Sequence, residues 1–185
     1  MTDDRLQKQI EFILEIDKVK HVIRQTHLPG DGRRENDAEH SWHFAAMAVI
    51  LAEYAKGEID VLRVVRMALM HDLVEIDAGD TFAYDVKGNE GKLEREREAA
   101  DRIFNLLPDD QALDLRDLWE EFEAQETAES KYAAALDRLQ PILMNFASEG
   151  AAWKKHGIAA DRVVARNQHI ENGAPVLWEY AKGLI

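Results

Sequence analysis

The stretch VLRVVRMALMHDLVEI, residues 61–76, decides how this sequence folds, because its apolar side chains recur with the period of a helix. Val64 and Ala68 lie within two turns before His71 on one face, so His71 and Asp72 are expected to point at or beside the core. The dipeptide alone is weak evidence, since short motifs recur by chance. A buried carboxylate without a partner is costly, so an arginine, hydrogen bonds or a metal must compensate Asp72.

Helical periodicity continues on both sides of this stretch. A first amphipathic helix is predicted to run to about Arg24, and residues 26–37 are predicted to form a loop because they are rich in Gly, Pro, Asn and Asp. Asn36 and Glu39 form a capping box that opens a second helix with His40 on its apolar stripe. Further helices are predicted over residues 92–107, 112–125, 130–147 and, within the C-terminal 158–182, over 163–170 and 176–181. The sequence therefore predicts an all-α fold in one domain, residues 1–185.

The composition restricts both the chemistry and the partners of this chain. Its 185 residues are 46% hydrophobic and include no cysteine, which leaves His, Asp and Glu as the strong metal ligands. A formal charge of −13 repels nucleic-acid backbone, so no polymer partner is expected. The N-terminus lacks the basic-then-apolar pattern of a signal peptide, and the most apolar run, residues 45–52, is too short to cross a bilayer. We therefore expect a cytoplasmic protein without a membrane partner.

Polar side chains on three predicted helices are candidates for one metal site. Glu75 follows His71 by four residues, His40 lies on the core-facing stripe of its helix, and Asp137 stands among apolar residues. Pro141, four residues after Asp137, removes a helix hydrogen bond to its carbonyl. Two alternatives remain at this point: neighbours satisfy His40 as an ordinary core histidine, or Asp137 pairs with an arginine. Nitrogen and oxygen donors together suit a divalent cation.

Three stretches resemble the HD-domain phosphohydrolases, and among them the single-domain 5′-deoxynucleotidases. They are RENDAEHS (34–41), HDLVE (71–75) with Gly79-Asp80, and LDRLQ (136–140). Their order and spacing extend over about residues 10–147. The resemblance implies an HD-type helical bundle, a homodimer and a principal divalent cation, which is held by His40, His71, Asp72 and Asp137.

The resemblance also implies roles for residues around that cation. Glu75 and Asp80, with the backbone carbonyl of Thr81, match a second metal or catalytic position. Arg24 matches an arginine that meets the substrate phosphate, and Gln25 stands where the bacterial nucleotidases have tryptophan. The wall around the sugar corresponds to Asp80, Thr81, Phe82 and Ala83. Arg33 is a second candidate for the phosphate.

These residues together predict hydrolysis of a nucleoside 5′-monophosphate, and the resemblance implies a deoxynucleotide. A divalent cation (Mn, Co, Fe, Zn or Mg) lowers the pKa of bound water and withdraws charge from phosphorus, and Glu75 is placed to deprotonate that water. Two other functions are carried as alternatives. One is a phosphodiesterase or pyrophosphohydrolase acting on a signalling nucleotide, and the other is a non-catalytic metal-binding interaction protein.

Overall fold

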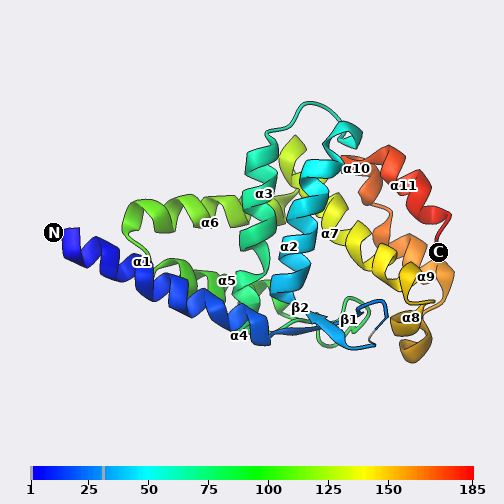
Figure 1. The fold of residues 1–185 in the computed structure, drawn as a ribbon, viewed down its shortest axis with the longest axis horizontal. Helices are drawn as coiled ribbons and strands as arrows, with labels where there is room; N and C mark the ends of the chain where they lie inside the picture. The colour runs from blue at the N-terminus through cyan, green and yellow to red at the C-terminus, as the bar shows by residue number, and fades with distance from the viewer. Residues whose placement is uncertain (1, 31) are drawn as a thin grey trace.

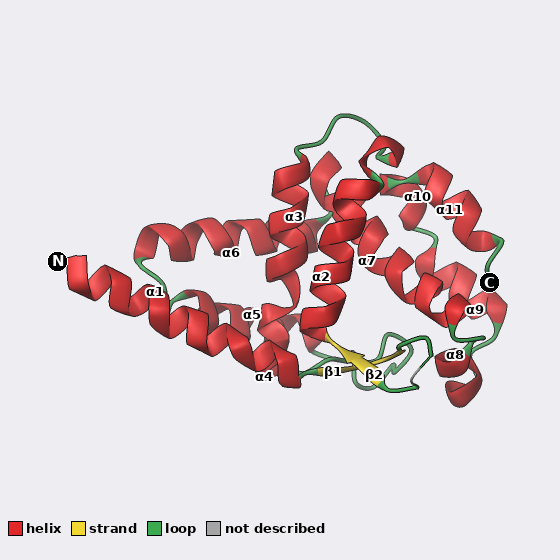
Figure 2. Ribbon diagram, viewed as in Figure 1, coloured by secondary structure: helices red, strands yellow, loops and turns green. Residues whose placement is uncertain are grey.

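The computed structural model describes residues 2–30 and 32–185, and helices form most of it (Figure 2). The predicted all-α fold is confirmed, with a small two-stranded sheet added to it. The longer helices are α1 (Thr2–Ile16), α2 (Asp37–Ile50), α3 (Val61–Met70), α5 (Lys92–Phe104), α6 (Asp109–Ala124) and α7 (Ala128–Ala147). The shorter ones are α4 (Glu75–Ala78), α8 (Ala151–His156), α9 (Ala160–Asn167), α10 (Ile170–Gly173) and α11 (Pro175–Lys182). The 3₁₀ helices are η1 (Asp17–His21), η2 (Ala52–Tyr54) and η3 (His71–Val74).

Helix α7 lies at the centre of the bundle, in contact with α2, α3 and α10 (Figure 1). Its Tyr132, Leu136 and Leu139 recur at helical spacing and are buried together with Phe44 of α2 and Met67 of α3. Each such side chain contributes about 1.5–3 kcal/mol when it leaves water. This core therefore holds α2, α3 and α7 in fixed relative positions.

A second apolar cluster holds α1, α5 and α6 together on one side of the bundle (Figure 1). Phe12 of α1 is buried there with Ile103 and Phe104 of α5 and Trp119 of α6. None of the helices formed by the described residues has both the length and the apolar character that a bilayer-spanning helix needs.

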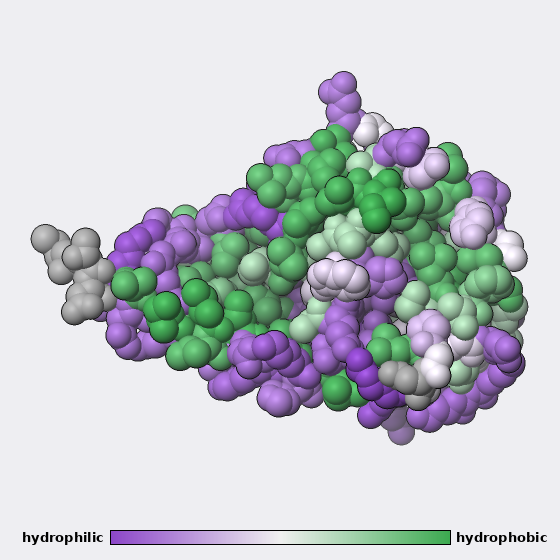
Figure 3. All heavy atoms as spheres, viewed as in Figure 1, coloured by the Kyte–Doolittle hydropathy of each residue, from purple (hydrophilic) through white to green (hydrophobic). Residues whose placement is uncertain are grey.

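Other apolar side chains stay at the surface. In Figure 3 they form green areas over α1 and over the upper parts of α2 and α3. Helix α1 is amphipathic as predicted, but much of its apolar stripe is exposed, because only Phe12 reaches the core. The exposed apolar residues of these three helices are Leu6, Ile10, Ile13, Leu14, Trp42, Val49, Ile50, Leu62 and Leu69.

The N-terminal segment corrects two predictions. The first helix does not reach Arg24, because α1 ends at Ile16, η1 follows it, and Val22 is extended with φ −80° and ψ 116°. The predicted loop over residues 26–37 contains strand β2 (Arg34–Asn36), which pairs antiparallel with β1 (Ile23–His27). Asp31 of that loop lies outside the described residues. This hairpin places Arg24 beside the N-terminus of α2 rather than on a helix.

The stretch 61–76 is also not one continuous helix. Asp60 caps α3 by accepting hydrogen bonds from the backbone N–H groups of Leu62 and Arg63, at 2.9 and 3.3 Å. The α-helix ends at Met70, and the chain tightens into η3 before α4 begins at Glu75. His71 and Asp72 therefore project from a 3₁₀ turn, whose side chains are spaced differently from those of an α-helix.

The C-terminal part differs from prediction mainly in its boundaries. The predicted helix over 163–170 is split into α9 and α10, and α8 had no counterpart in the prediction. Helix α7 runs through Pro141 without a break, and Asn145 satisfies the carbonyl of Pro141 through its side-chain amide at 2.9 Å. Between α4 and α5 the chain from Gly79 to Gly91 forms no helix or strand.

Candidate metal centre

His40 reaches the centre of the bundle because α2 begins three residues before it, at Asp37. The predicted capping box is confirmed: the Asn36 side chain accepts from the Glu39 N–H, and the Glu39 carboxylate accepts from the Asn36 N–H, both at 3.0 Å. One turn of helix then turns the His40 imidazole inward, where it is fully buried. The cap thus fixes the rotation of α2 that presents His40 to α3 and α7.

Two imidazoles and two carboxylates converge at one point between α2, η3 and α7. His40 Nε2 lies 3.0 Å from Asp137 Oδ1 and 3.9 Å from Asp72 Oδ2. His71 Nε2 lies 3.1 Å from Asp72 Oδ2 and 3.8 Å from Asp137 Oδ1. These four residues are far apart in sequence, so the tertiary fold alone brings them together. The structure places all four residues that the sequence proposed as ligands around one centre.

The His71 ring is oriented by a hydrogen bond on its far side. Its Nδ1 donates to the carbonyl of Ala68 at 3.0 Å, which leaves the Nε2 lone pair facing the centre. That Nε2 is buried and has no hydrogen-bond partner. Burial acts to lower the pKa of His71, but the charges of Asp72 and Asp137 outweigh it and raise the pKa to about 10. Negative charge therefore dominates the centre.

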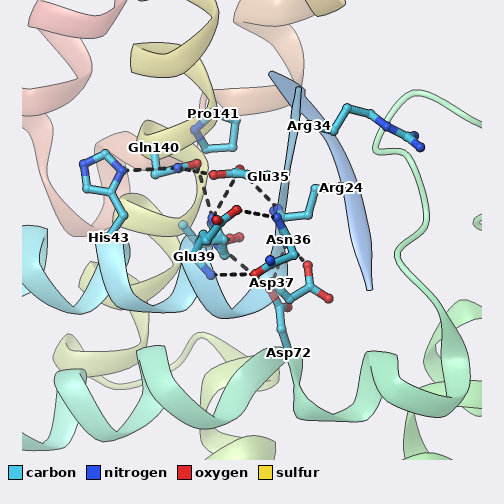
Figure 4. Close-up of polar contacts among 12 residues, drawn as sticks. Arg24, Arg34, Glu35, Asn36, Asp37, Glu39, His43, Asp72, Gln140 and Pro141 are labelled. Atoms are coloured by element: carbon cyan, nitrogen blue, oxygen red, sulfur yellow. Dashed lines mark hydrogen bonds and ion pairs between the residues drawn. The ribbon is translucent and has the colours of Figure 1, made fainter. Parts of the chain in front are cut away.

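The His40 ring is oriented by a chain of buried side chains. Gln140 of α7 donates through Nε2 to Glu35 Oε2 at 2.9 Å, so its Oε1 is free to accept from His40 Nδ1 at 3.2 Å. Gln140 Nε2 also approaches His43 Nδ1 at 3.3 Å, and burial lowers the pKa of His43, which keeps that nitrogen an acceptor (Figure 4). Since a carboxylate only accepts, Glu35 sets the Gln140 amide, and Gln140 sets the His40 tautomer. The His40 Nε2 lone pair is thereby directed at the centre.

Arg24 is held beside the centre by three carboxylates. Its Nη1 donates to Asp72 Oδ2 at 2.8 Å and to Asp37 Oδ1 at 3.2 Å, and its Nε lies 3.5 Å from Glu35 Oε1 (Figure 4). Sequence reasoning missed Asp37, although its place three residues before His40, on the same helix face, was a usable signal. Burial, and next the charge of Asp72, raise the pKa of Asp37 to about 7.

Glu75 and Asp80 extend the acidic side of the centre. Glu75 is buried, its Oε2 has no hydrogen-bond partner, and Lys92 Nζ lies 3.9 Å from its Oε1. Burial, followed by the charges of Asp72 and Asp37, raises the pKa of Glu75 well above its usual value. Burial also raises the pKa of Asp80. Oxygens of Asp37, Asp72 and Glu75 lie within 4.8 Å of one another, a second place where a cation fits.

A cavity opens from this centre toward α8 and α9. Its volume is about 130 Å³, and its mouth is open to solvent. Its wall contains Arg24, Glu75 and the four predicted residues Asp80, Thr81, Phe82 and Ala83. It also contains Gln25, whose position the sequence analysis singled out, and five residues that it did not: Tyr84, Lys92, Arg138, Trp153 and Arg166.

Arg33 does not belong to this wall, which corrects its predicted role at the phosphate. Its Nη2 and Nη1 donate to the two carboxylate oxygens of Glu39, at 2.6 and 3.0 Å, on the exposed side of the hairpin. A bidentate pair of this kind holds the guanidinium away from the cavity.

The residues present fit a divalent cation. Two nitrogen and two carboxylate donors form a set that Mn, Fe, Co and Zn accept, and the unpartnered Nε2 of His71 faces the other three side chains. One ring nitrogen each from His40 and His71 and one carboxylate oxygen from Asp72 lie within 4.8 Å of one another. A buried cluster of this charge is costly unless a cation compensates it.

Comparison with known proteins agrees with this geometry. The family model described as HD domain matches residues 16–178. A crystal structure from Magnetospirillum magnetotacticum, described as a predicted metal-dependent phosphohydrolase, is 53% identical, with a TM-score of 0.94 over 100% of this chain and 92% of that one. A Pyrococcus horikoshii structure is 20% identical with a TM-score of 0.67 over 95% of this chain and 99% of that one, which shows the fold alone.

Curated relatives share part of the chain. The human protein named 5′-deoxynucleotidase HDDC2 is 34% identical over 135 residues, 72% of this chain and 65% of its own length. The Xenopus laevis protein of the same name is 37% identical over 122 residues, 66% of this chain and 57% of its own length. The match therefore spans just under two thirds of the length of these relatives.

Proposed function

Since this chain belongs to the HD-domain family, we propose that it is a metal-dependent phosphohydrolase that converts (deoxy)nucleoside 5′-monophosphates to nucleoside and phosphate. One observation carries the proposal: the buried imidazoles of His40 and His71 meet Asp72 and Asp137 at a cavity whose wall also contains Arg24. The relatives named 5′-deoxynucleotidase support the choice of substrate.

The principal cation would be held by His40, His71, Asp72 and Asp137. When bound, it polarises the phosphate and lowers the pKa of water at the site. These nitrogen and oxygen donors can bind Mn, Co, Fe, Zn or Mg as divalent cations. The Glu35–Gln140–His40 chain keeps one imidazole ready to bind, since it holds the Nε2 lone pair toward the centre.

Arg24 is proposed to bind the phosphate. Its Nη1 is occupied by Asp37 and Asp72, which fix the guanidinium plane at the cavity wall. The remaining N–H groups are then available to donate to phosphate oxygens, and a guanidinium can do so in bidentate fashion. This arrangement supplies local positive charge in a chain whose net charge is −13.

Glu75 is proposed as the general base that takes a proton from the attacking water. Its carboxylate is buried in the cavity wall with one unpartnered oxygen, and its raised pKa brings it nearer to the range where a base works at neutral pH. Glu75 takes the proton from the attacking water and returns it to the sugar oxygen, which leaves as a hydroxyl group when its bond to phosphorus breaks.

A second cation position is proposed on the acidic side of the centre. The resemblance assigns it to Glu75, Asp80 and the backbone carbonyl of Thr81, all of which belong to the cavity wall. Asp37 adds a fourth donor that the resemblance does not include, since it lies with Glu75 and Asp72 in one acidic group. Phe82 and Ala83 are proposed to contact the sugar.

Phosphate release from purified protein tests this function directly. The protein is stripped with chelator, reloaded with Mn²⁺ or Co²⁺, and assayed with nucleoside mono-, di- and triphosphates and with cyclic and dinucleotide diesters. We expect metal-dependent release from 5′-monophosphates, with deoxynucleotides preferred. Hydrolysis of diesters or pyrophosphate bonds alone would identify the alternative chemistry, and no hydrolysis of any ester would leave a metal-binding protein without this activity.

We also propose that two copies associate through the exposed apolar side chains of α1, α2 and α3. Leu14, Trp42 and Ile50 are between 67% and 72% exposed, which is unusual for three large apolar residues on neighbouring helices. Figure 3 shows green areas over these helices on one face of the molecule. Light scattering after size exclusion should give twice the chain mass for the wild type and less for Trp42→Glu. A cytoplasmic location stays a prediction from the sequence.

A further inference from the structure

The outer end of the cavity gathers positive charge in an otherwise acidic protein. Arg138 of α7 and Arg166 of α9 both belong to the cavity wall, and Tyr84 lies between them and the exposed Arg162. The Arg162 guanidinium carbon is 5.6 Å from the centroid of the Tyr84 ring. The charges of all three arginines act on the Tyr84 hydroxyl. Three guanidiniums in one place are unexpected where acidic residues outnumber basic ones 36 to 23.

The two arginines of the wall have almost no protein counterion. Arg138 Nε lies 3.6 Å from Asp137 Oδ2, but the other oxygen of Asp137 belongs to the metal centre. Arg166 makes no ion pair or side-chain hydrogen bond with any residue that the structure describes. Burial, and next the positive charge of Arg138, lower the pKa of Arg166. Arg166 is exposed, so solvent screens part of this repulsion, but the two guanidiniums share one cavity wall, where like charges without a counterion cost free energy.

An anion between these arginines would remove this cost. Guanidiniums pair with phosphate through two parallel N–H bonds, which are stronger than bonds between neutral groups. The scissile phosphate has its own partners at the inner end, namely the principal cation and Arg24. The nearby amide of Asn167 is buried and bonded to the carbonyl of Val163 at 2.8 Å, so it steadies the helix that carries Arg166.

We propose that Arg138 and Arg166 form a second anion-binding subsite, so that the preferred substrate is a nucleotide with two phosphoryl groups. At the metal centre, water breaks the bond between the 5′-phosphorus and the sugar oxygen, while the second phosphoryl group is held by Arg138 and Arg166. A 3′,5′-bisphosphate then yields the nucleoside 3′-phosphate and phosphate, and a 5′-diphosphate yields the nucleoside and pyrophosphate. The second group is either a 3′-phosphate or a β-phosphate, since both offer the same chemistry to a guanidinium. This inference rests on the proposed phosphohydrolase function and narrows its substrate class.

The test compares three substrates that differ only in their second phosphoryl group. They are a deoxynucleoside 5′-monophosphate, its 3′,5′-bisphosphate and its 5′-diphosphate, assayed with the metal-loaded wild type, Arg166→Gln and Arg166→Lys. Loss of one charge-assisted bond corresponds to about 10- to 100-fold. We expect kcat/KM to favour one doubly phosphorylated substrate by that factor, Arg166→Gln to remove the preference, and Arg166→Lys to restore part of it.

Arg162→Gln is the matched control, because it removes the same charge one turn earlier on α9, from an exposed side chain outside the cavity wall. It should keep the preference within about threefold. The bisphosphate and the diphosphate are separate arms, so the favoured one identifies where the second group is attached. Calorimetric binding of the same three ligands gives a readout that does not depend on turnover.

The outcomes distinguish a failure of the proposed subsite from a failure of the proposed phosphohydrolase function. Hydrolysis of the monophosphate with no preference in kcat/KM or affinity for a second phosphoryl group overturns the inference and keeps the function. An Arg166→Gln variant that weakens all three substrates equally also overturns it, because Arg166 would then serve the scissile phosphate. Absence of hydrolysis of every ester refutes the function, while the affinity ratio between wild type and Arg166→Gln still decides whether the subsite exists.

Discussion

Gln140 offers the sharpest test of how the metal centre is organised. It is fully buried, and it links Glu35 to His40 through bonds of 2.9 and 3.2 Å. Replacing it by leucine keeps similar volume but removes the acceptor for His40 Nδ1 and the donor for Glu35. The imidazole then loses the partner that directs its Nε2 toward the centre.

Two effects of known size follow from this change. Loss of an outer partner of a metal-bound histidine weakens metal affinity by about 10- to 100-fold, which equals about 1.4–2.8 kcal/mol. Leaving a buried donor or acceptor unsatisfied costs about 1–3 kcal/mol. Since Gln140→Leu orphans two groups, we expect the metal-free protein to lose about 2–5 kcal/mol of its free energy of unfolding.

The assay is Mn²⁺ binding by competition with a chelating dye, together with thermal unfolding in EDTA. Ser130→Ala is the control, because Ser130 is equally buried in α7 but bonds only to Thr127 at the helix start. It should cost about 1 kcal/mol of stability and leave Mn²⁺ affinity unchanged. Glu35→Gln keeps the side-chain shape and should weaken Mn²⁺ binding less than Gln140→Leu. A Gln140→Leu protein that binds Mn²⁺ within threefold of the wild type would refute the orienting role.

Three further outcomes are expected. Asp72→Ala should abolish turnover and Mn²⁺ binding while circular dichroism shows largely unchanged helix content, and retained turnover would exclude Asp72 as a ligand. Removing the cation with EDTA should lower Tm. Restoring Mn²⁺ to 100 times its Kd should raise the free energy of unfolding by about 2.7 kcal/mol, or Tm by about 5–11 °C. An unchanged Tm would show that the folded protein does not bind the cation. Burial acts to raise the pKa of Glu121, but hydrogen bonds from Arg63 and Thr127 outweigh it and lower that pKa below its usual value. Arg63 is 39% exposed and Glu121 15%, so Glu121→Gln should cost only about 0.5–1 kcal/mol at pH 7, and that difference should shrink toward zero as acid protonates the carboxylate. Urea titrations from pH 3 to pH 7 measure it, and a difference that grows toward low pH would contradict the assignment.

Local signals in the sequence determined a large part of this protein. Helix periodicity and the capping box at Asn36 and Glu39 depend on residues within a few positions of one another, and the structure contains both. The candidate metal ligands could be found for a similar reason, because polar residues on apolar helix faces stand out in the sequence. They are His40, His71, Asp72 and Asp137.

Errors arose where the chain departs from regular helix. The periodic pattern predicted a first helix that runs to Arg24 and a third that runs to Ile76. In the structure, η1 and the hairpin end the first helix early, and η3 interrupts the third. Extended backbone at residues 23–27 forms because β2 pairs with it, which a local propensity does not report. Arg33 was misplaced for the same reason, as the hairpin turns it toward Glu39 on the surface.

Only the tertiary structure decided which groups orient the metal-binding side chains and which charged groups surround them. His40 and Gln140 are 100 positions apart, and Gln140 and Glu35 are 105 apart, so no periodicity in the sequence links them. The burial of Asp37 beside Arg24 and the approach of Arg138 to Arg166 likewise depend on how helices pack. Hydrogen bonds and charges act over a few ångströms in space, whatever the separation along the chain, and the packed core is what sets those distances.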